Sequence, residues 1–425
     1  MKRLNMAKSI IGFSSKYFFE ISIFLCFFLP PLGILLVLIN GCYHLHITLK
    51  EGRKVQITPG LFLLGSLFLS TIGSALFNKD YSYFLISALL LSYMGLYVKM
   101  KNKNVQKTLS SIKWITIWGG LYFYALYPVQ KLFMKNMYVS YLTGTALIGQ
   151  TEIQQDYERL MGASYNPNLS VALLLFGLSF LLGECLKNIK SASYKKLALQ
   201  VIVVGMLVHA IFLTGSKAGF GILIVIFTLF IFRWNRYYAL FLASIMLINI
   251  HFILELMPRK ARLFASADMR KVIWERSIHL WQEHSLFGIT PIGFHREYMN
   301  LYHDNIPHAH NMVIGIFTEY GSLGGVALLI VISIHVYKML SLYLSNVASK
   351  KHLDTFLLSL PIILLTGVFD YVLYSPQVAL IAIILLATWE KYTARLNLVH
   401  PRILSFVRKW NVDLTVKHGK KKEYL

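Results

Sequence analysis

Between residues 295 and 310 the chain carries five side chains that can bind a metal ion or move a proton, namely His295, His303, Asp304, His308 and His310. Imidazole and carboxylate groups are common zinc ligands. The spacing contains no pair of histidines four residues apart, as a helical zinc motif requires, so a metal site is not favoured. Two interpretations remain. The residues are polar groups at the mouth of a cavity, or one histidine is a general base, a role that its near-neutral pKa suits.

Cations accompany these histidines. The segment 256–310 contains seven of them, which are Arg259, Lys260, Arg262, Arg270, Lys271, Arg276 and Arg296. A further cation, Lys217, follows Thr214 and Ser216 in a short link between apolar runs. This link therefore carries one positive charge and two hydroxyl groups within four residues. Either the Lys217 ammonium reaches the membrane interface from the end of a span, or it binds a phosphate at the rim of a cavity.

The composition shows what kind of chain must position these residues. Of 425 residues, 56% are hydrophobic and 14% are charged, and the mean hydropathy is +0.56. Apolar runs of about 18–22 residues recur, the length that spans a bilayer core. We predict an all-α polytopic membrane protein with one integral membrane domain over residues 1–425. A soluble enzyme, a secreted disulfide scaffold and a disordered protein are excluded.

The positions of the basic residues predict the topology. The expected spans are 10–29, 32–49, 59–77, 81–98, 111–133, 168–186, 197–214, 217–232, 238–255, 311–340, 355–373 and 377–394. The first two are divided at Pro30 and Pro31, because proline is poorly tolerated inside a helix. Thirty of the 42 Lys and Arg residues then lie on one side, which is the cytoplasmic side by the positive-inside rule. Both termini are expected there, including a basic tail at 395–425. The net charge of +23 is explained in this way, and nucleic acid is not an expected partner.

Two outer loops are long, at 134–167 and 256–310. Residues 268–286 lack Pro and Gly and predict a helix at the membrane surface that carries Arg270. We expect the segments 286–288 and 291–293 to break that helix. The inner loops have no phosphate-binding Gly-rich pattern, so any chemistry is expected on the outer face.

Three blocks of sequence resemble the O-antigen ligase and O-antigen polymerase superfamily of bacterial membrane glycosyltransferases, over about residues 155–340. The first block is 159–162 with 166–168, and the second is 213–219. The third runs from Arg270 through 286–288 and 291–293 to 308–311 and 319–324. The resemblance implies a GT-C-like enzyme of the bacterial cytoplasmic membrane. Its donor would be a glycan on undecaprenyl diphosphate and its acceptor another glycan or lipid-linked glycan, with no cofactor and no metal.

The resemblance also implies roles for individual residues. His310 would activate the acceptor hydroxyl with His308 positioned beside it, and Arg270 and Lys217 would bind the diphosphate. The remaining candidates for the cavity are Arg159, Asn168, Asn311 and Glu319. Two of these residues have an equally open alternative to a role in the cavity. Asn311 could cap a helix, and Glu319 could be a helix-packing partner. Asp370, with Tyr371 and Tyr374, could join the site, although structural pairing is favoured. Lys217 departs from the family, which has arginine there, and a lysine lacks the two-pronged contact of a guanidinium with phosphate.

Within this family a polymerase is slightly favoured over a ligase. The alternative from another class is a secondary transporter or a flippase of lipid-linked glycans. Transporters tend to show internal repeats and charges at the midplane. No repeat is evident in this sequence, which favours the glycosyltransferase.

The topology can be tested by labelling. In a cysteine-free background, a cysteine at Asn300 should react with a membrane-impermeant maleimide added to intact spheroplasts, whereas one at Lys103 should not. The two positions lie on opposite sides of the membrane according to the charge distribution. The reverse labelling pattern would contradict both the orientation and chemistry on the outer face.

Overall fold

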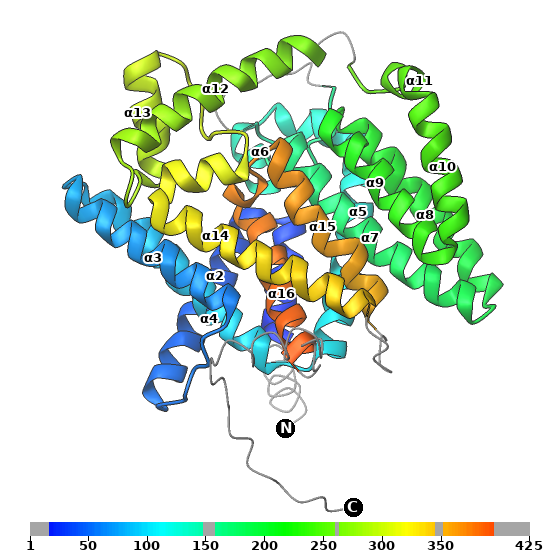
Figure 1. Ribbon diagram of the computed structural model, residues 1–425, viewed down its shortest axis with the longest axis horizontal. Helices are drawn as coiled ribbons and strands as arrows, with labels where there is room; N and C mark the ends of the chain where they lie inside the picture. The colour runs from blue at the N-terminus through cyan, green and yellow to red at the C-terminus, as the bar shows by residue number, and fades with distance from the viewer. Residues whose placement is uncertain (1–16, 148–157, 260–262, 345–351, 395–425) are drawn as a thin grey trace, which may run out of the picture.

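The computed structural model describes residues 17–147, 158–259, 263–344 and 352–394, and every regular element in these ranges is a helix (Figure 1). A helix over Tyr17–Phe28 comes first. The elements that follow are α2 (Pro30–Lys50), α3 (Pro59–Phe77), η1 (Tyr81–Tyr83), α4 (Phe84–Asn102), α5 (Val105–Met134), α6 (Met137–Thr143), α7 (Pro167–Lys190), α8 (Tyr194–Leu213), α9 (Lys217–Trp234), α10 (Arg236–Ile248), α11 (Ile250–Glu255), α12 (Leu263–Glu283), α13 (Thr290–Tyr302), α14 (Met312–Leu344), α15 (Leu353–Phe369), η3 (Val372–Tyr374) and α16 (Pro376–Ala394). The basic tail at 395–425 lies outside the described residues.

The predicted spans coincide with helices. In the described ranges, eight helices are long and apolar enough to cross a membrane. The other predicted spans fall on the helix Tyr17–Phe28, on α5, on α10 with α11, and on α15. The prediction of an all-α polytopic membrane protein is confirmed.

The chain folds back at Pro30, where the sequence predicted a break. A side chain on Gly33 would meet the backbone nitrogen of Cys26 at 2.2 Å, so α2 packs directly against the helix that precedes it. Residues 17–50 therefore form two helices and not one long span.

Prolines begin helices in this protein as well as separating them. Pro30, Pro59, Pro167 and Pro291 each occupy the first turn of a helix, where the missing N–H costs no hydrogen bond. Pro291 corrects a prediction, because residues 291–293 were expected to break the surface helix and instead begin α13. The helix α12 ends at Glu283, just before the other predicted break at 286–288.

Helix α7 forms the centre of the bundle. In its apolar 18-residue stretch, 89% of the residues are buried inside the protein. Helices α5, α8, α9 and α15 pack around it. The equally apolar helix α8 is only 17% buried and leaves most of its surface to the surroundings of the bundle, so the enclosure of α7 reflects its central position. Its first turn therefore carries Asn168 to a fixed place at one end of the bundle.

Helices α12 and α13 lie over that end of the bundle (Figure 1). They have a small core of their own, formed by Ile273, Leu280, Ile289, Phe294, Tyr298 and Ala309. The contacts that attach this unit to α3 and its loop include an ion pair between Arg296 and Asp80 and a hydrogen bond of 2.6 Å from the Ser74 hydroxyl to the Gly288 carbonyl.

The link between α12 and α13 packs against a kink in α14. Gly321 has φ +63° and ψ −169°, so the helix is interrupted there. The Ser322 amide donates to the Ser285 carbonyl at 2.7 Å, and the Ile289 amide donates to the Thr318 carbonyl at 3.2 Å. A Cβ on Gly321 would lie 2.2 Å from the Leu286 carbonyl oxygen, so the close approach requires glycine.

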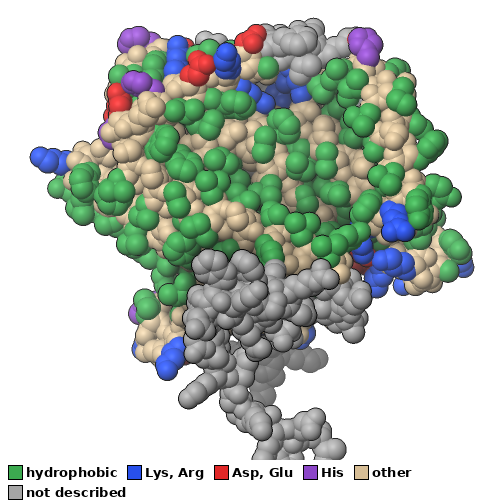
Figure 2. Space-filling view, in the orientation of Figure 1, with side chains coloured by type: hydrophobic (Ala, Val, Ile, Leu, Met, Phe, Trp, Pro, Cys, Tyr) green, Lys and Arg blue, Asp and Glu red, His purple; other side chains and the backbone are tan. Residues whose placement is uncertain are grey.

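The surface has the distribution expected of a membrane protein. Figure 2 shows hydrophobic side chains across the middle of the visible face, with acidic, basic and histidine side chains gathered over α12 and α13. At the opposite ends of α7 and α9, Lys190 and Arg233 both pair with Asp354, at 2.7 and 2.6 Å. Basic residues thus lie at the end of the bundle that the sequence assigns to the cytoplasmic side.

The kink gives a test of the fold. Gly321→Ala should lower the thermal stability of the purified protein, since alanine disfavours a positive φ and its methyl group would meet the Leu286 carbonyl. Gly221→Ala in α9 is the matched control, because that glycine has open space around its Cβ position. Equal melting temperatures for the two variants would show that the kink does not hold the α12–α13 link.

Candidate active site

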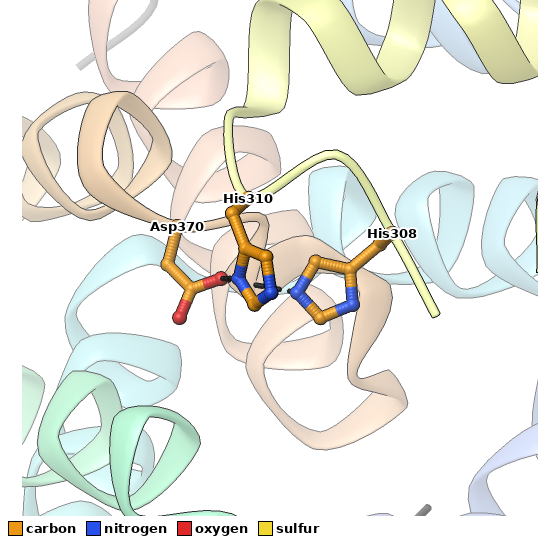
Figure 3. Close-up of side chains that lie close together, drawn as sticks. All are labelled: His308, His310 and Asp370. Carbon is orange, nitrogen blue, oxygen red and sulfur yellow. Dashed lines mark hydrogen bonds and ion pairs between the residues drawn. The ribbon is translucent and has the colours of Figure 1, made fainter. Parts of the chain in front are cut away.

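A buried carboxylate, Asp370, joins three parts of the chain at the end of the bundle below α12 and α13. It follows α15 in an extended conformation. Its Oδ1 lies 3.1 Å from His308 Nε2 and 3.0 Å from His310 Nδ1, and both rings approach from the link before α14 (Figure 3). The same oxygen accepts the Tyr371 amide at 2.8 Å, and Oδ2 accepts the Asn168 side-chain amide at 2.8 Å.

The charge of Asp370 fixes the protons on both imidazoles. Burial by itself would raise the pKa of the Asp370 carboxyl, but the hydrogen bonds from His308 and His310 outweigh it and hold this pKa well below its usual range. An ionised carboxylate only accepts hydrogen bonds. His310 therefore carries its proton on Nδ1, and His308 carries its proton on Nε2. The second nitrogen of each neutral ring is left with a lone pair.

The two histidines differ in their access to a substrate. The His310 side chain is 26% exposed, whereas that of His308 is 10% exposed and lies 5.1 Å from the Tyr374 ring, centroid to centroid. Burial is the largest influence on His308 and lowers its pKa, with the hydrogen bond to Asp370 acting in the opposite direction. His308 thus stays neutral at neutral pH, and His310 is the histidine whose lone pair a hydroxyl can reach.

The backbone turns the His310 ring toward Asp370. His310 has φ +51°, a left-handed conformation that non-glycine residues adopt rarely and often at functional sites. Directly after it, the Asn311 side-chain oxygen accepts the amides of Val313 and Ile314, at 2.9 and 3.1 Å. The sequence left a cap or a cavity role open for Asn311, and the structure shows the cap.

Hydrogen bonds connect the Asp370 carboxylate to a second group of residues. Asn168 Oδ1 accepts from a terminal nitrogen of Arg159 at 3.3 Å. Arg159 Nε in turn donates to the Thr214 carbonyl at 2.7 Å, in the turn that joins α8 to α9. The predicted cavity residues Arg159 and Asn168 thus link the Asp–His cluster to the segment that contains Lys217.

Several cations surround this turn. Lys217 is the first residue of α9, whose N-cap is Ser216. Arg259 Nε donates to the Gly215 carbonyl at 3.0 Å. The positive charge of Arg270 in α12 reaches the cluster, since it contributes to lowering the pKa of His308. The sequence had singled out Lys217 and Arg270, but nothing in it distinguished Arg259 from the other cations of the outer loop.

Three of the five residues between 295 and 310 lie apart from the cluster. His295 Nδ1 is 3.3 Å from the Ile306 carbonyl, His303 ends α13 in a left-handed conformation, and Asp304 pairs with Arg276. Of the five residues between 295 and 310, the structure therefore brings only His308 and His310 together. Glu319 is fully buried in α14, one turn after Gly315, which packs against the Tyr371 ring.

The same cluster has the composition of a metal site. The ligand atoms of His308, His310 and Asp370 all lie within 4.8 Å of one another, and two imidazoles with one carboxylate can hold a catalytic zinc ion. The sequence did not reveal this set, because Asp370 is sixty residues away from His310 along the chain. Asp370 can thus orient two imidazoles by hydrogen bonds or share a metal with them.

An apolar cavity of about 480 Å³ begins beside the cluster at Met312 and Tyr371. Its walls come mainly from α3, α4, α14, α15 and α16, with Val225 of α9 and the segment after α15, and it reaches His335 toward the other end of the bundle. Apart from its tyrosines and His335, the lining is almost entirely aliphatic. A hydrocarbon chain fits such a lining.

Taken together, the helices and the cluster define a polytopic membrane protein with a histidine–carboxylate unit beside a cationic turn. Residues 201–329 match a family model described as O-Antigen ligase. This match supports membership of the chain in the O-antigen ligase/polymerase superfamily, as the three sequence blocks predicted. No curated protein matches the chain. Arg159, Asn168 and Asp370 lie outside the matched segment, although the structure connects them to residues within it.

The role of Asp370 can be tested by Asp370→Asn. The neutral amide of the new asparagine cannot stabilise a positively charged ring of His308 or His310. The turnover rate of the enzyme should therefore fall by roughly a hundredfold or more. Unchanged turnover would show that Asp370 only holds the loops together.

Proposed function

We propose that the protein transfers or polymerises a glycan carried on undecaprenyl diphosphate at the outer face of the bacterial cytoplasmic membrane. The observation that carries the proposal is the hydrogen-bonded path from His310 through Asp370, Asn168 and Arg159 to the turn before Lys217. This path supports a site that combines a proton acceptor with a group of cations.

The reaction follows from these groups. His310 Nε2 takes the proton of an acceptor hydroxyl, and the hydroxyl oxygen attacks the anomeric carbon of the donor sugar. The bond from that carbon to the diphosphate oxygen breaks, and the electron pair leaves with the diphosphate. The Asp370 carboxylate stabilises the imidazolium that forms, and His308 keeps the carboxylate in place.

The cations act on the leaving group. As the diphosphate departs, its negative charge increases, and fixed positive charges stabilise it in a site that water enters poorly. We assign this role to Lys217 and Arg270. The sugar–diphosphate bond is already activated, so the reaction needs no nucleotide.

The apolar cavity supports a lipid-borne donor. It begins at Tyr371, the residue directly after Asp370, so a hydrocarbon tail in the cavity would hold its headgroup beside the histidines. We favour a polymerase, in which the acceptor is another lipid-linked glycan, over a ligase, in which it is a different cell-surface molecule. Reaction of the purified protein with a single lipid-linked donor separates them, since only a polymerase then forms longer glycans.

The proposed base gives the central test. His310→Ala should lower the rate of transfer from a lipid-linked glycan by at least about a hundredfold, the low end of the range for loss of acid–base catalysis. His308→Ala should cost less, because this buried ring acts through Asp370. Products are measured by mass spectrometry after reaction without added nucleotide or metal.

A chelator separates the two uses of the His308–His310–Asp370 cluster. EDTA should leave the wild-type rate unchanged if the imidazoles carry protons rather than a metal. A wild-type rate that EDTA abolishes and added zinc restores would instead assign the cluster to a metal ion. Near-normal turnover by His310→Ala would overturn both the proposed base and a metal held by this residue. The absence of any glycan product, together with movement of the donor across a vesicle membrane, would instead favour a transporter or a flippase.

A further inference from the structure

The turn between α8 and α9 holds two guanidinium groups in an unusual way. Arg159 Nε donates to the carbonyl of Thr214 at 2.7 Å, and Arg259 Nε donates to the next carbonyl, that of Gly215, at 3.0 Å. The two arginines come from different loops, one before α7 and the other after α11. Both are thus fixed on consecutive residues of one tight turn.

Gly215 makes this arrangement possible. It has φ +60°, a left-handed conformation that favours glycine. The glycine therefore allows the tight turn whose carbonyl groups both arginines contact. Lys217 begins α9 two residues later, so three cations belong to the same short stretch of surface.

The bond to Gly215 orients Arg259 without using most of its donors. A guanidinium has five N–H groups, and only the one on Nε is directed at the carbonyl. Among the described residues, no carboxylate forms an ion pair with Arg259. Its two terminal nitrogens keep the planar pair of donors that matches two oxygens of a phosphate.

We propose that Arg259 binds the second phosphate of the diphosphate and supplies the guanidinium that this chain lacks at position 217. Lys217 acts as a point charge on one phosphate, whereas Arg259 contacts the other through two parallel N–H bonds. This inference rests on the proposed function for the identity of the ligand. It adds a binding residue that the resemblance does not include.

The proposal is tested by the binding of two lipids to the purified full-length protein in nanodiscs, a polyprenyl diphosphate and the corresponding monophosphate. Arg259→Ala should weaken binding of the diphosphate by about tenfold or more, as expected for loss of a charged hydrogen-bonding group. Binding of the monophosphate should change by less than about twofold, since Lys217 and Arg270 remain in place. Lys271→Ala is the matched control, because this α12 lysine has a side chain that is 77% exposed and forms an ion pair with Glu275 at 4.0 Å.

A double substitution separates phosphate binding from a structural role. Adding Lys217→Arg to Arg259→Ala should restore most of the lost diphosphate affinity, because the guanidinium returns to the same turn. Equal losses for both lipids, or no rescue by Lys217→Arg, would show that Arg259 only anchors its loop to Gly215. Melting temperatures of all variants confirm that they are folded.

The binding assay keeps this inference distinct from the proposed reaction. If the wild type discriminates between the two lipids in an Arg259-dependent way but forms no glycan product, Arg259 stands and the transferase function fails. If the wild type forms products while Arg259→Ala binds and turns over normally, the function stands and the role of Arg259 fails.

Discussion

The structure depends on keeping one carboxylate charged inside the protein. Removing an ionised carboxylate from water costs several kcal/mol unless hydrogen bonds replace its hydration. Asp370 receives four such bonds, from Asn168, His308, His310 and the Tyr371 amide. These donors come from the start of α7, the link before α14 and the segment after α15. The charge of Asp370 is therefore stable only while three separate parts of the bundle keep their positions.

Other features of the fold serve that requirement. The enclosed helix α7 holds Asn168 at a fixed position near Asp370. The left-handed backbone of His310, followed by the helix cap at Asn311, directs the imidazole toward Asp370. The α12–α13 unit carries Arg270, and the α14 kink at Gly321 secures the link that joins its helices. The hydrogen bonds that surround the Asp370 carboxylate hold these groups rigidly in surroundings of low dielectric constant. The site is thus set by the scaffold before any substrate arrives.

Hydropathy and charge alone predicted the helical spans and the break at Pro30, because burial in a membrane imposes a length and a composition on each segment. His308, His310, Lys217 and Arg270 were singled out as candidates through motifs shared with a family. For Asp370 the sequence favoured structural pairing, because no neighbouring motif marks a single acidic residue at a helix end. Its side-chain partners lie at least sixty residues away along the chain. Arg259 was indistinguishable among seven loop cations until the structure placed it on Gly215. Pro291 was read as a helix breaker because the sequence does not show which side of a proline is helical.

The separation along the chain of the groups around Asp370 has a consequence for biosynthesis. The bond between Asn168 and Asp370 joins residues 202 positions apart, and contacts of such long range form late because a large loop must first close. A nascent chain that has inserted as far as α14 already possesses its histidines and its cations, but it lacks the carboxylate that orients the rings. The hydrogen-bonded cluster of His308, His310 and Asp370 is therefore complete only after α15 and the residue that follows it have been synthesised and inserted.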